Sequence, residues 1–142
     1  MGIGKTYKCL NCNNIVELYE GVGEVWHSYS TDMFYPPKKG NYGMNFYNEL
    51  NKRVIKEAQK FIEEYKDVCV TEAYLQPYIC EECGKVKSDL YFKIESKSNT
   101  FSPKYFCRCG GQYKRLTKKA AKHLHCNKCG HKMVQISGLL WD

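Results

Sequence analysis

Eight of the nine cysteines in this 142-residue chain fall into four close pairs, and this pattern restricts the fold more than any other feature. The pairs are Cys9/Cys12, Cys80/Cys83, Cys107/Cys109 and Cys126/Cys129. Two thiolates separated by one or two residues can reach the same metal ion when the backbone between them turns tightly. The four pairs therefore predict two metal sites, each with four thiolate ligands.

Residues that tolerate a positive φ angle follow every pair, as a tight turn requires. They are Asn13 and Asn14, Gly84, Gly110 and Gly111, and Gly130. Tetrahedral coordination by four cysteines favours zinc, which has no redox chemistry, and it leaves no open position for a substrate. We therefore expect two structural Zn²⁺ ions.

Two segments, CEECGKVKSDLYFKI and HCNKCGHKMVQI, resemble the knuckles of four-cysteine zinc ribbons, also called rubredoxin-type knuckles. The resemblance covers the four knuckles and their adjoining strands, and extends to small bacterial proteins with two such ribbons, which are often of unassigned function. It implies antiparallel β-hairpins clamped by zinc. The sequence departs from the pattern where Cys107-Arg-Cys109 is one residue short and where a long insertion splits the first ribbon.

The pairing of the knuckles is open to three arrangements. Pairing in chain order closes loops 13–79 and 110–125, whereas the alternatives close 84–106 and 13–125, or 13–106 and 84–125. Closure entropy favours chain order by only about 1 kcal/mol. RCGGQYKRL and KCGHKMVQI are adjacent knuckle-strand units that can face each other as one ribbon. We therefore expect the first two pairs to form one site and the last two the other.

The long segment between the first two pairs must contain folded material, because a structureless loop of that length is rare inside a compact domain. In residues 45–67, NFYNELNKRVIKEAQKFIEEYKD, apolar residues recur at helical spacing and predict one long amphipathic helix that packs on the sheet. We also predict a strand over residues 68–80, VCVTEAYLQPYIC. Cys69 in this strand is expected to be buried and not to bind metal.

These features together predict an α+β protein made of two small zinc-stapled antiparallel β-hairpin ribbons. Residues 1–95 would hold the first ribbon with its helical insertion, at about residues 13–79, and residues 96–142 the second. Each half needs a staple, since a single hydrophobic core is marginal below roughly 70–80 residues. The N-terminal residues lack the apolar stretch of a secretory signal, and no run is long enough to span a membrane, so we expect a cytoplasmic protein with reduced thiols.

Charge divides the chain unevenly. Residues 1–95 carry 12 Lys/Arg and 14 Asp/Glu, whereas residues 96–142 carry 10 Lys/Arg and one acidic residue, Asp142. Two Zn(Cys)₄ sites lower the formal charge from +7 to about +3 but leave the second half basic. Basic groups bind phosphates and aromatic rings stack on bases, so we expect single-stranded RNA or DNA as partner. The candidate residues are Lys114, Arg115, Lys118, Lys119, Lys122, Tyr113 and Tyr105.

The alternative function is a protein-binding adaptor or inhibitor that uses the helix and the aromatic loop from Trp26 to Tyr47. The discriminating feature is whether exposed aromatic rings lie beside the C-terminal lysines or on the helix and loop. His123, His125 and His131 surround the last knuckle, and one of them could replace a thiolate if the short Cys107/Cys109 pair cannot supply both sulfurs. No HxE or HExxH motif occurs, and we expect no catalytic residues and no enzyme activity.

Overall fold

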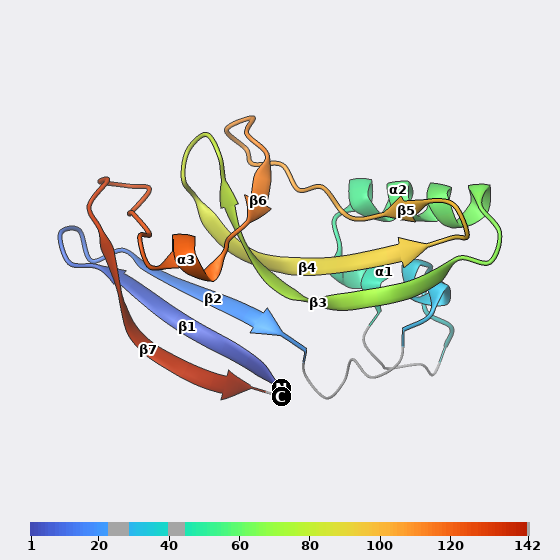
Figure 1. The fold of residues 1–142 in the computed structure, drawn as a ribbon, viewed down its shortest axis with the longest axis horizontal. Coiled ribbons are helices and arrows are strands. Elements are labelled where there is room, and N and C mark those ends of the chain that lie inside the picture. The colour runs from blue at the N-terminus through green and yellow to red at the C-terminus, as the bar shows by residue number, and fades with distance from the viewer. Residues whose placement is uncertain (23–28, 40–44, 142) are drawn as a thin grey trace. The chain divides into compact units, whose positions relative to one another are not determined.

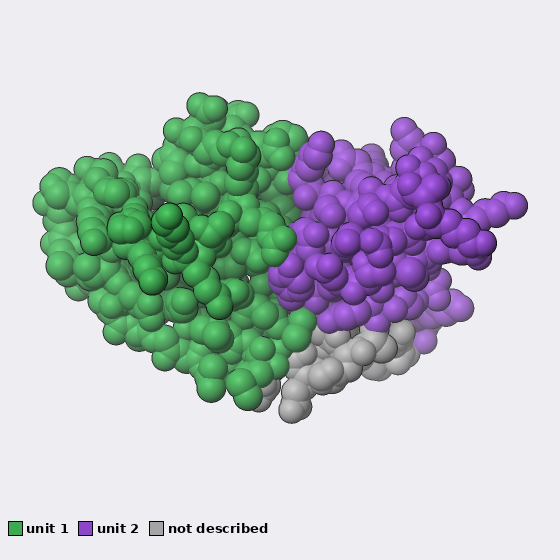
Figure 2. Space-filling view, viewed as in Figure 1, with its two compact units in different colours: residues 1–23, 75–89, 105–142 green, residues 24–74, 90–104 purple. Residues whose placement is uncertain are grey.

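The structure, a computed structural model, describes residues 1–22, 29–39 and 45–141. The chain forms two compact units, coloured separately in Figure 2. Unit 1 comprises Met1–Gly23, Leu75–Asp89 and Tyr105–Asp142, and unit 2 comprises Glu24–Tyr74 and Leu90–Lys104. The expected boundary between residues 95 and 96 does not coincide with this division, because unit 1 takes segments from both sides of it.

Three long strands form one part of unit 1. Strands β1 (Gly2–Cys9), β2 (Ile15–Gly21) and β7 (Met133–Trp141) lie side by side in Figure 1, with β1 in the centre. Both pairings are antiparallel, and β1 is aligned with β7 from Gly2↔Trp141 to Cys9↔Met133. The two ends of the described chain therefore pair along almost the full length of β1.

A second hairpin contributes residues to both units, since unit 1 takes residues 75–89 of it and unit 2 takes residues 69–74 and 90–95. Strands β3 (Cys69–Cys80) and β4 (Val86–Glu95) are neighbours, and the three-residue strand β6 (Tyr113–Arg115) pairs with the end of β3 through Cys80↔Tyr113. β3 confirms the strand expected there. The expected partnership between β6 and β7 is wrong, because β7 pairs with β1 and β6 with β3.

A small core holds unit 1 together. Tyr7, Leu18 and Met133 come from the three long strands, and Leu116 and Leu124 flank the short helix α3 (Lys118–Ala121). Cys9 and Cys126 belong to the same buried cluster. Thr117 caps α3 by accepting a hydrogen bond from the backbone N–H of Ala120 at 3.1 Å. The core thus includes metal-ligand candidates, and the two leucines anchor α3 at both ends.

Unit 2 contains the helices of the insertion. They are the 3₁₀ helix η2 (Thr31–Phe34), α1 (Phe46–Glu49) and α2 (Lys52–Glu64), and strand β5 (Thr100–Phe101) pairs with β4. The single long helix expected over residues 45–67 is wrong. Leu50 is extended, with ψ at 153°, and the side chain of Asn51 caps a new helix by accepting from the N–H of Val54 at 3.0 Å.

The apolar face of α2 is buried within its own unit. Val54, Ala58 and Phe61 are buried, and Phe34, Phe46 and Phe92 form an aromatic cluster with ring centroids 4.9 to 6.1 Å apart. The expected packing of the helix on the sheet is seen at Phe61, whose ring centroid lies 5.8 Å from that of Phe101 in β5. Rings at these separations contribute beyond their buried area, by roughly 0.5–1.5 kcal/mol a pair.

Cys69 departs from expectation, because it lies in β3 but is exposed and outside both cysteine groups. Its position at the beginning of the strand explains the exposure, since the burial of β3 begins further along, at Ala73. Among the described residues, no helix combines the length and the apolar character needed to cross a membrane.

Candidate metal centres and basic surface

Two groups of four cysteines assemble in the described part of the chain. The terminal cluster consists of Cys9, Cys12, Cys126 and Cys129, and the central cluster of Cys80, Cys83, Cys107 and Cys109. Within each group the four sulfur atoms all lie within 4.8 Å of one another. All eight cysteines are free thiols, so neither group is a set of disulfides.

The sulfur separations fit a tetrahedral metal ion. Zinc–sulfur bonds of about 2.3 Å at tetrahedral angles place the sulfurs about 3.8 Å apart. The terminal cluster has Cys9 Sγ 3.3 Å from Cys129 Sγ, and Cys12 Sγ 3.6 Å from Cys126 Sγ. In the central cluster, Cys80 and Cys109 are 3.5 Å apart, and Cys83 and Cys107 are 3.7 Å apart. Each group can therefore hold one metal ion with four thiolate ligands.

The expected pairing in chain order is wrong. The first pair joins the last, and the second joins the third, which is the nested arrangement that closes loops 84–106 and 13–125. Strand pairing supplies the reason, because the register Cys9↔Met133 places the first and last knuckles together, and Cys80↔Tyr113 does the same for the middle two. The long β1–β7 pairing outweighs a closure term of about 1 kcal/mol.

The turns of the three CxxC knuckles share one hydrogen-bond pattern. In the first, the N–H of Cys9 donates to the carbonyl of Asn14 at 2.8 Å, and the N–H of Asn13 returns to the carbonyl of Cys9 at 2.9 Å. The knuckles at Cys80 and Cys126 repeat both bonds at the same spacing. The returning residue has positive φ in each case: 61° at Asn13, 76° at Gly84 and 77° at Gly130. The turn residues predicted from the sequence are thus confirmed at these positions.

The short Cys107-Arg-Cys109 knuckle keeps the pattern with one residue fewer. The N–H of Cys107 donates to the carbonyl of Gly111 at 2.8 Å, and the N–H of Gly110 returns to Cys107 at 3.0 Å. Gly110 has φ at 95°. A Cβ atom on Gly111 would lie 2.7 Å from Cys80 Sγ, so this glycine is required by close packing against the neighbouring knuckle. The shorter spacing therefore still delivers both sulfurs.

Hydrogen bonds to sulfur lower the pKa of some cysteines in each cluster, whereas the pKa of Cys12 and of Cys109 is raised. Donation from the backbone of His131 lowers the pKa of Cys129 to about 5. Donation from the backbone of Cys109, followed by the hydroxyl of Tyr113, lowers the pKa of Cys107 to about 6. The side-chain amide of Asn14 also donates to Cys126 Sγ, at 3.6 Å. Because the thiolate is the metal-binding form, these contacts favour metal binding at Cys129 and Cys107, one ligand of each group.

The histidines around the last knuckle are not members of either four-ligand group in the described residues. Nδ1 of His131 lies 3.3 Å from the carbonyl oxygen of Cys129, so its ring hydrogen-bonds to the knuckle backbone. His123 and His125 are exposed. Four sulfurs complete each group without a nitrogen ligand.

The predicted basic residues gather at β6 and α3 in unit 1. Lys118, Lys119 and Lys122 are exposed on or next to α3. Lys114 forms an ion pair with Glu81 at 2.5 Å, and Arg115 donates to Gln76 Oε1 at 3.2 Å. The lysines of α3 are therefore the part of the set whose charge is least engaged by contacts within the protein.

The two tyrosines expected to stack on bases are buried. Tyr105 is 2% exposed and Tyr113 is 7% exposed, and Lys87 Nζ lies 4.7 Å from the centroid of each ring. Burial raises the pKa of both hydroxyl groups. The stacking role is therefore corrected, since these rings cannot receive a base without leaving the core. Tyr113 instead supports the central cluster through Cys107.

Exposed aromatic rings occur on both candidate surfaces. Phe106 is 51% exposed, beside the central cluster, and Tyr47 is 40% exposed on α1. Tyr47 lines a hollow of about 390 Å³ with Pro36, Ile55 and Gln59. Trp26 of the proposed adaptor loop lies outside the described residues. The location of exposed aromatic rings therefore does not distinguish nucleic-acid binding from protein binding. The distribution of charge is the remaining difference between the two surfaces.

Sequence reasoning did not find two basic residues that lie next to α3. Lys5 on β1 and Lys132 just before β7 line a hollow together with Lys118 and Lys122. Their positions near opposite ends of the sequence hide this proximity, and only the nested pairing of the knuckles brings them together. The net charge of the C-terminal half was the one available signal, and it concerns Lys132 alone.

No protein-family model, no curated protein and no solved structure matches this chain. Its site must therefore be interpreted from the geometry and chemistry of its own residues.

Proposed function

We propose that the chain is a non-enzymatic zinc protein that binds nucleic acid through the basic surface at β6 and α3. Both four-cysteine groups suit Zn²⁺, whose preference for four tetrahedral thiolates matches the sulfur separations. Sites with four protein ligands have no open coordination position, so their role is to stabilise the fold.

The observation that carries the nucleic-acid proposal is the group of three exposed lysines, Lys118, Lys119 and Lys122, at α3. No ion pair joins any of them to a carboxylate in the part of the chain that the structure describes. Unpaired cationic groups in one place attract the phosphate backbone and release its counterions on binding. Residues 96–142 carry ten basic residues and one acidic residue, and this excess adds to the positive electrostatic potential around the three lysines.

The test replaces Lys114, Arg115, Lys118, Lys119 and Lys122 with Gln in one variant. We expect it to lose binding to a labelled single-stranded oligonucleotide while it keeps two zinc ions. Wild-type affinity should fall with salt, with a slope of about −3.5 in log affinity against log salt for five phosphate contacts. Fluorescence anisotropy at several salt concentrations and metal analysis give both readouts.

A control variant removes the same charge from unit 2, by changing Lys38, Lys39, Lys52, Lys56 and Lys60 to Gln. These lysines are exposed, and two of them line the hollow beside Tyr47. We expect this variant to bind the oligonucleotide nearly as well as wild type. A wild-type protein without affinity for single-stranded or duplex nucleic acid at low salt would refute the proposal.

The second candidate function is protein binding at the hollow of about 390 Å³ on unit 2. Pro36, Tyr47 and Ile55 give it an apolar lining, and Lys52 and Lys56 add positive charge. Aromatic residues such as the exposed Tyr47 are enriched in protein–protein interfaces. Ile55 is 4% exposed, so it only borders the hollow, and the other buried residues of α2, Val54, Ala58 and Phe61, do not line it.

A further inference from the structure

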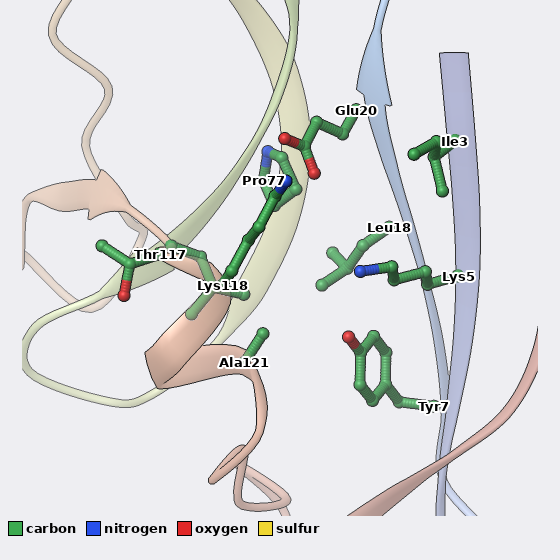
Figure 3. Close-up of a pocket in the computed structure, with 10 residues that line it drawn as sticks. Ile3, Lys5, Tyr7, Leu18, Glu20, Pro77, Thr117, Lys118 and Ala121 are labelled. Atoms are coloured by element: carbon green, nitrogen blue, oxygen red, sulfur yellow. The ribbon is translucent and has the colours of Figure 1, made fainter.

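A second hollow, of about 490 Å³, lies in unit 1 between α3 and the strands β1 and β7. We refer to it as the lysine groove. Its lining consists of Lys5, Tyr7, Lys118, Ala121, Lys122, Lys132, Met133, Val134 and Gln135. Figure 3 shows a smaller adjoining hollow, where Lys5 and Tyr7 on β1 point toward Lys118 and Ala121 of α3. The groove is therefore built by elements from opposite ends of the sequence.

The elements that form the groove are fixed in place. Lys5 and Tyr7 are two residues apart on β1, so they share one face of the sheet. Tyr7 and Met133 are buried in the core of unit 1, and α3 is held by its Thr117 cap and by the buried Leu116 and Leu124. The four lysines thus project from supported backbone, and a ligand would not need to order a loop in order to bind.

The charge of the residues that line the groove is positive. Four lysines line it and no carboxylate does, and none of the four is joined to a carboxylate by an ion pair in the described ranges. The adjoining hollow of about 20 Å³ includes one carboxylate, that of Glu20, which lines it together with Lys5 and Lys118 (Figure 3). Four like charges around one concavity repel each other, and a bound polyanion relieves that repulsion.

The lining of the groove contains both apolar and polar side chains besides the lysines. Ala121, Met133 and Val134 supply apolar surface, whereas Gln135 supplies an exposed amide that both donates and accepts. A suitable ligand carries phosphates at its edge and a less polar body between them. The volume falls within the range of about 300–1,000 Å³ for small-ligand sites, which suits a segment of nucleotide size rather than a duplex.

We propose that the lysine groove holds the phosphate backbone of a single-stranded nucleic acid, with Lys5 and Lys132 as binding residues. This inference rests on the proposed function and adds to it the path of the strand. Helix α3 has only four residues, too few to lie along a major groove as a recognition helix, which favours a single strand over a duplex. The strand passes between α3 and β7 and contacts lysines on both sides.

The test changes Lys5 and Lys132 to Gln, two residues outside the basic set identified from the sequence. The probes are labelled oligo-dT and oligo-U, measured by fluorescence anisotropy from low to moderate salt. We expect affinity to fall and the salt slope to become shallower by about 1.4, which is two phosphate contacts at about 0.7 each. The matched control changes Lys85 and Lys128, both exposed in unit 1 outside the groove, and should keep the wild-type slope.

The outcomes separate the two proposals. If wild type binds neither oligonucleotide nor duplex, the proposed function fails and this inference fails with it. If wild type binds but the Lys5→Gln/Lys132→Gln variant binds equally well, the groove is refuted while the proposed function stands. Tighter, lysine-dependent binding of a duplex would overturn the single-strand assignment. Unchanged zinc content and thermal transition show that each variant is folded.

Discussion

The terminal and central clusters each contain four cysteine ligands in similar turns, but they connect different parts of the chain. The terminal cluster closes the long loop from Asn13 to His125 and ties β1 to the C-terminal knuckle. The central cluster closes the much shorter loop from Gly84 to Phe106. Closing the longer loop costs about 1.4 kcal/mol more in conformational entropy, expressed as free energy. The comparison shows that similar knuckles can serve as a global clasp or as a local staple.

The two clusters also differ in their surroundings. The terminal cluster has two buried cysteines, Cys9 and Cys126, and both belong to the hydrophobic core. The central cluster has one, Cys80, and it includes the short knuckle. Removal of a terminal ligand therefore damages metal site and core together, whereas removal of a central ligand acts chiefly on the metal site.

The largest effect is expected from Cys126→Ser. The variant should bind one zinc ion and lose the clasp, since structural zinc contributes about 10–16 kcal/mol of apparent binding free energy that is coupled to folding. Nested pairing predicts that Cys9, Cys12 and Cys129 become reactive toward an alkylating reagent while the central four cysteines stay protected. Mass spectrometry of labelled peptides measures each thiol separately.

The control for this experiment is Cys80→Ser, which replaces the equivalent buried first cysteine of its knuckle. It should expose Cys83, Cys107 and Cys109 and leave the terminal cluster protected. If Cys126→Ser instead exposed Cys107 and Cys109, the knuckles would pair in chain order and the nested arrangement would be refuted.

A smaller and more local effect is expected from Gly111→Ala. The new methyl group would lie 2.7 Å from Cys80 Sγ and 2.7 Å from Glu82 Cγ, so the central knuckles must separate. Overpacking of this kind costs about 1–3 kcal/mol, and here it displaces a metal ligand. Zinc release to a chelating dye should show faster loss of one ion and an unchanged second ion.

Gly130→Ala is the matched variant at the terminal cluster. A Cβ atom there meets nothing within 4 Å, so the only cost is the φ angle of 77°, which is worth about 1 kcal/mol for a residue other than glycine. Equal zinc-release rates in the two variants would contradict the assignment of Gly111 to close packing.

The smallest effect is expected from Tyr113→Phe, which removes the hydroxyl that supports Cys107. Loss of an outer hydrogen bond to a ligand typically lowers metal affinity by about 10–100-fold. The decrease should be confined to one of the two ions in a competition titration. Asn14→Ala tests the same kind of support at Cys126, and should weaken the other ion. A decrease at both ions in either variant would show that the clusters are coupled.

Local chemistry in the sequence was sufficient for the ligands and their turns. Four cysteine pairs identify both groups, and Asn13, Gly84, Gly110 and Gly130 supply the positive φ angles that the turns need. The strand over residues 69–80 and the buried face of α2 also follow from pattern alone. Each of these depends on residues within a few positions of one another, where spacing and backbone preference determine the outcome.

Tertiary structure alone decided which knuckles share an ion, because loop-closure entropy separates the arrangements by only about 1 kcal/mol. The long pairing of β1 with β7 determined the answer, and it also placed Lys5 and Lys132 around the same hollow as the lysines of α3. Tyr105 and Tyr113 are buried by contacts around β3, where Tyr105 lies 5.3 Å from Tyr78 between ring centroids and Tyr113 pairs with Cys80. Such contacts join residues far apart in sequence, and their free energies depend on register and burial, which residue spacing does not encode.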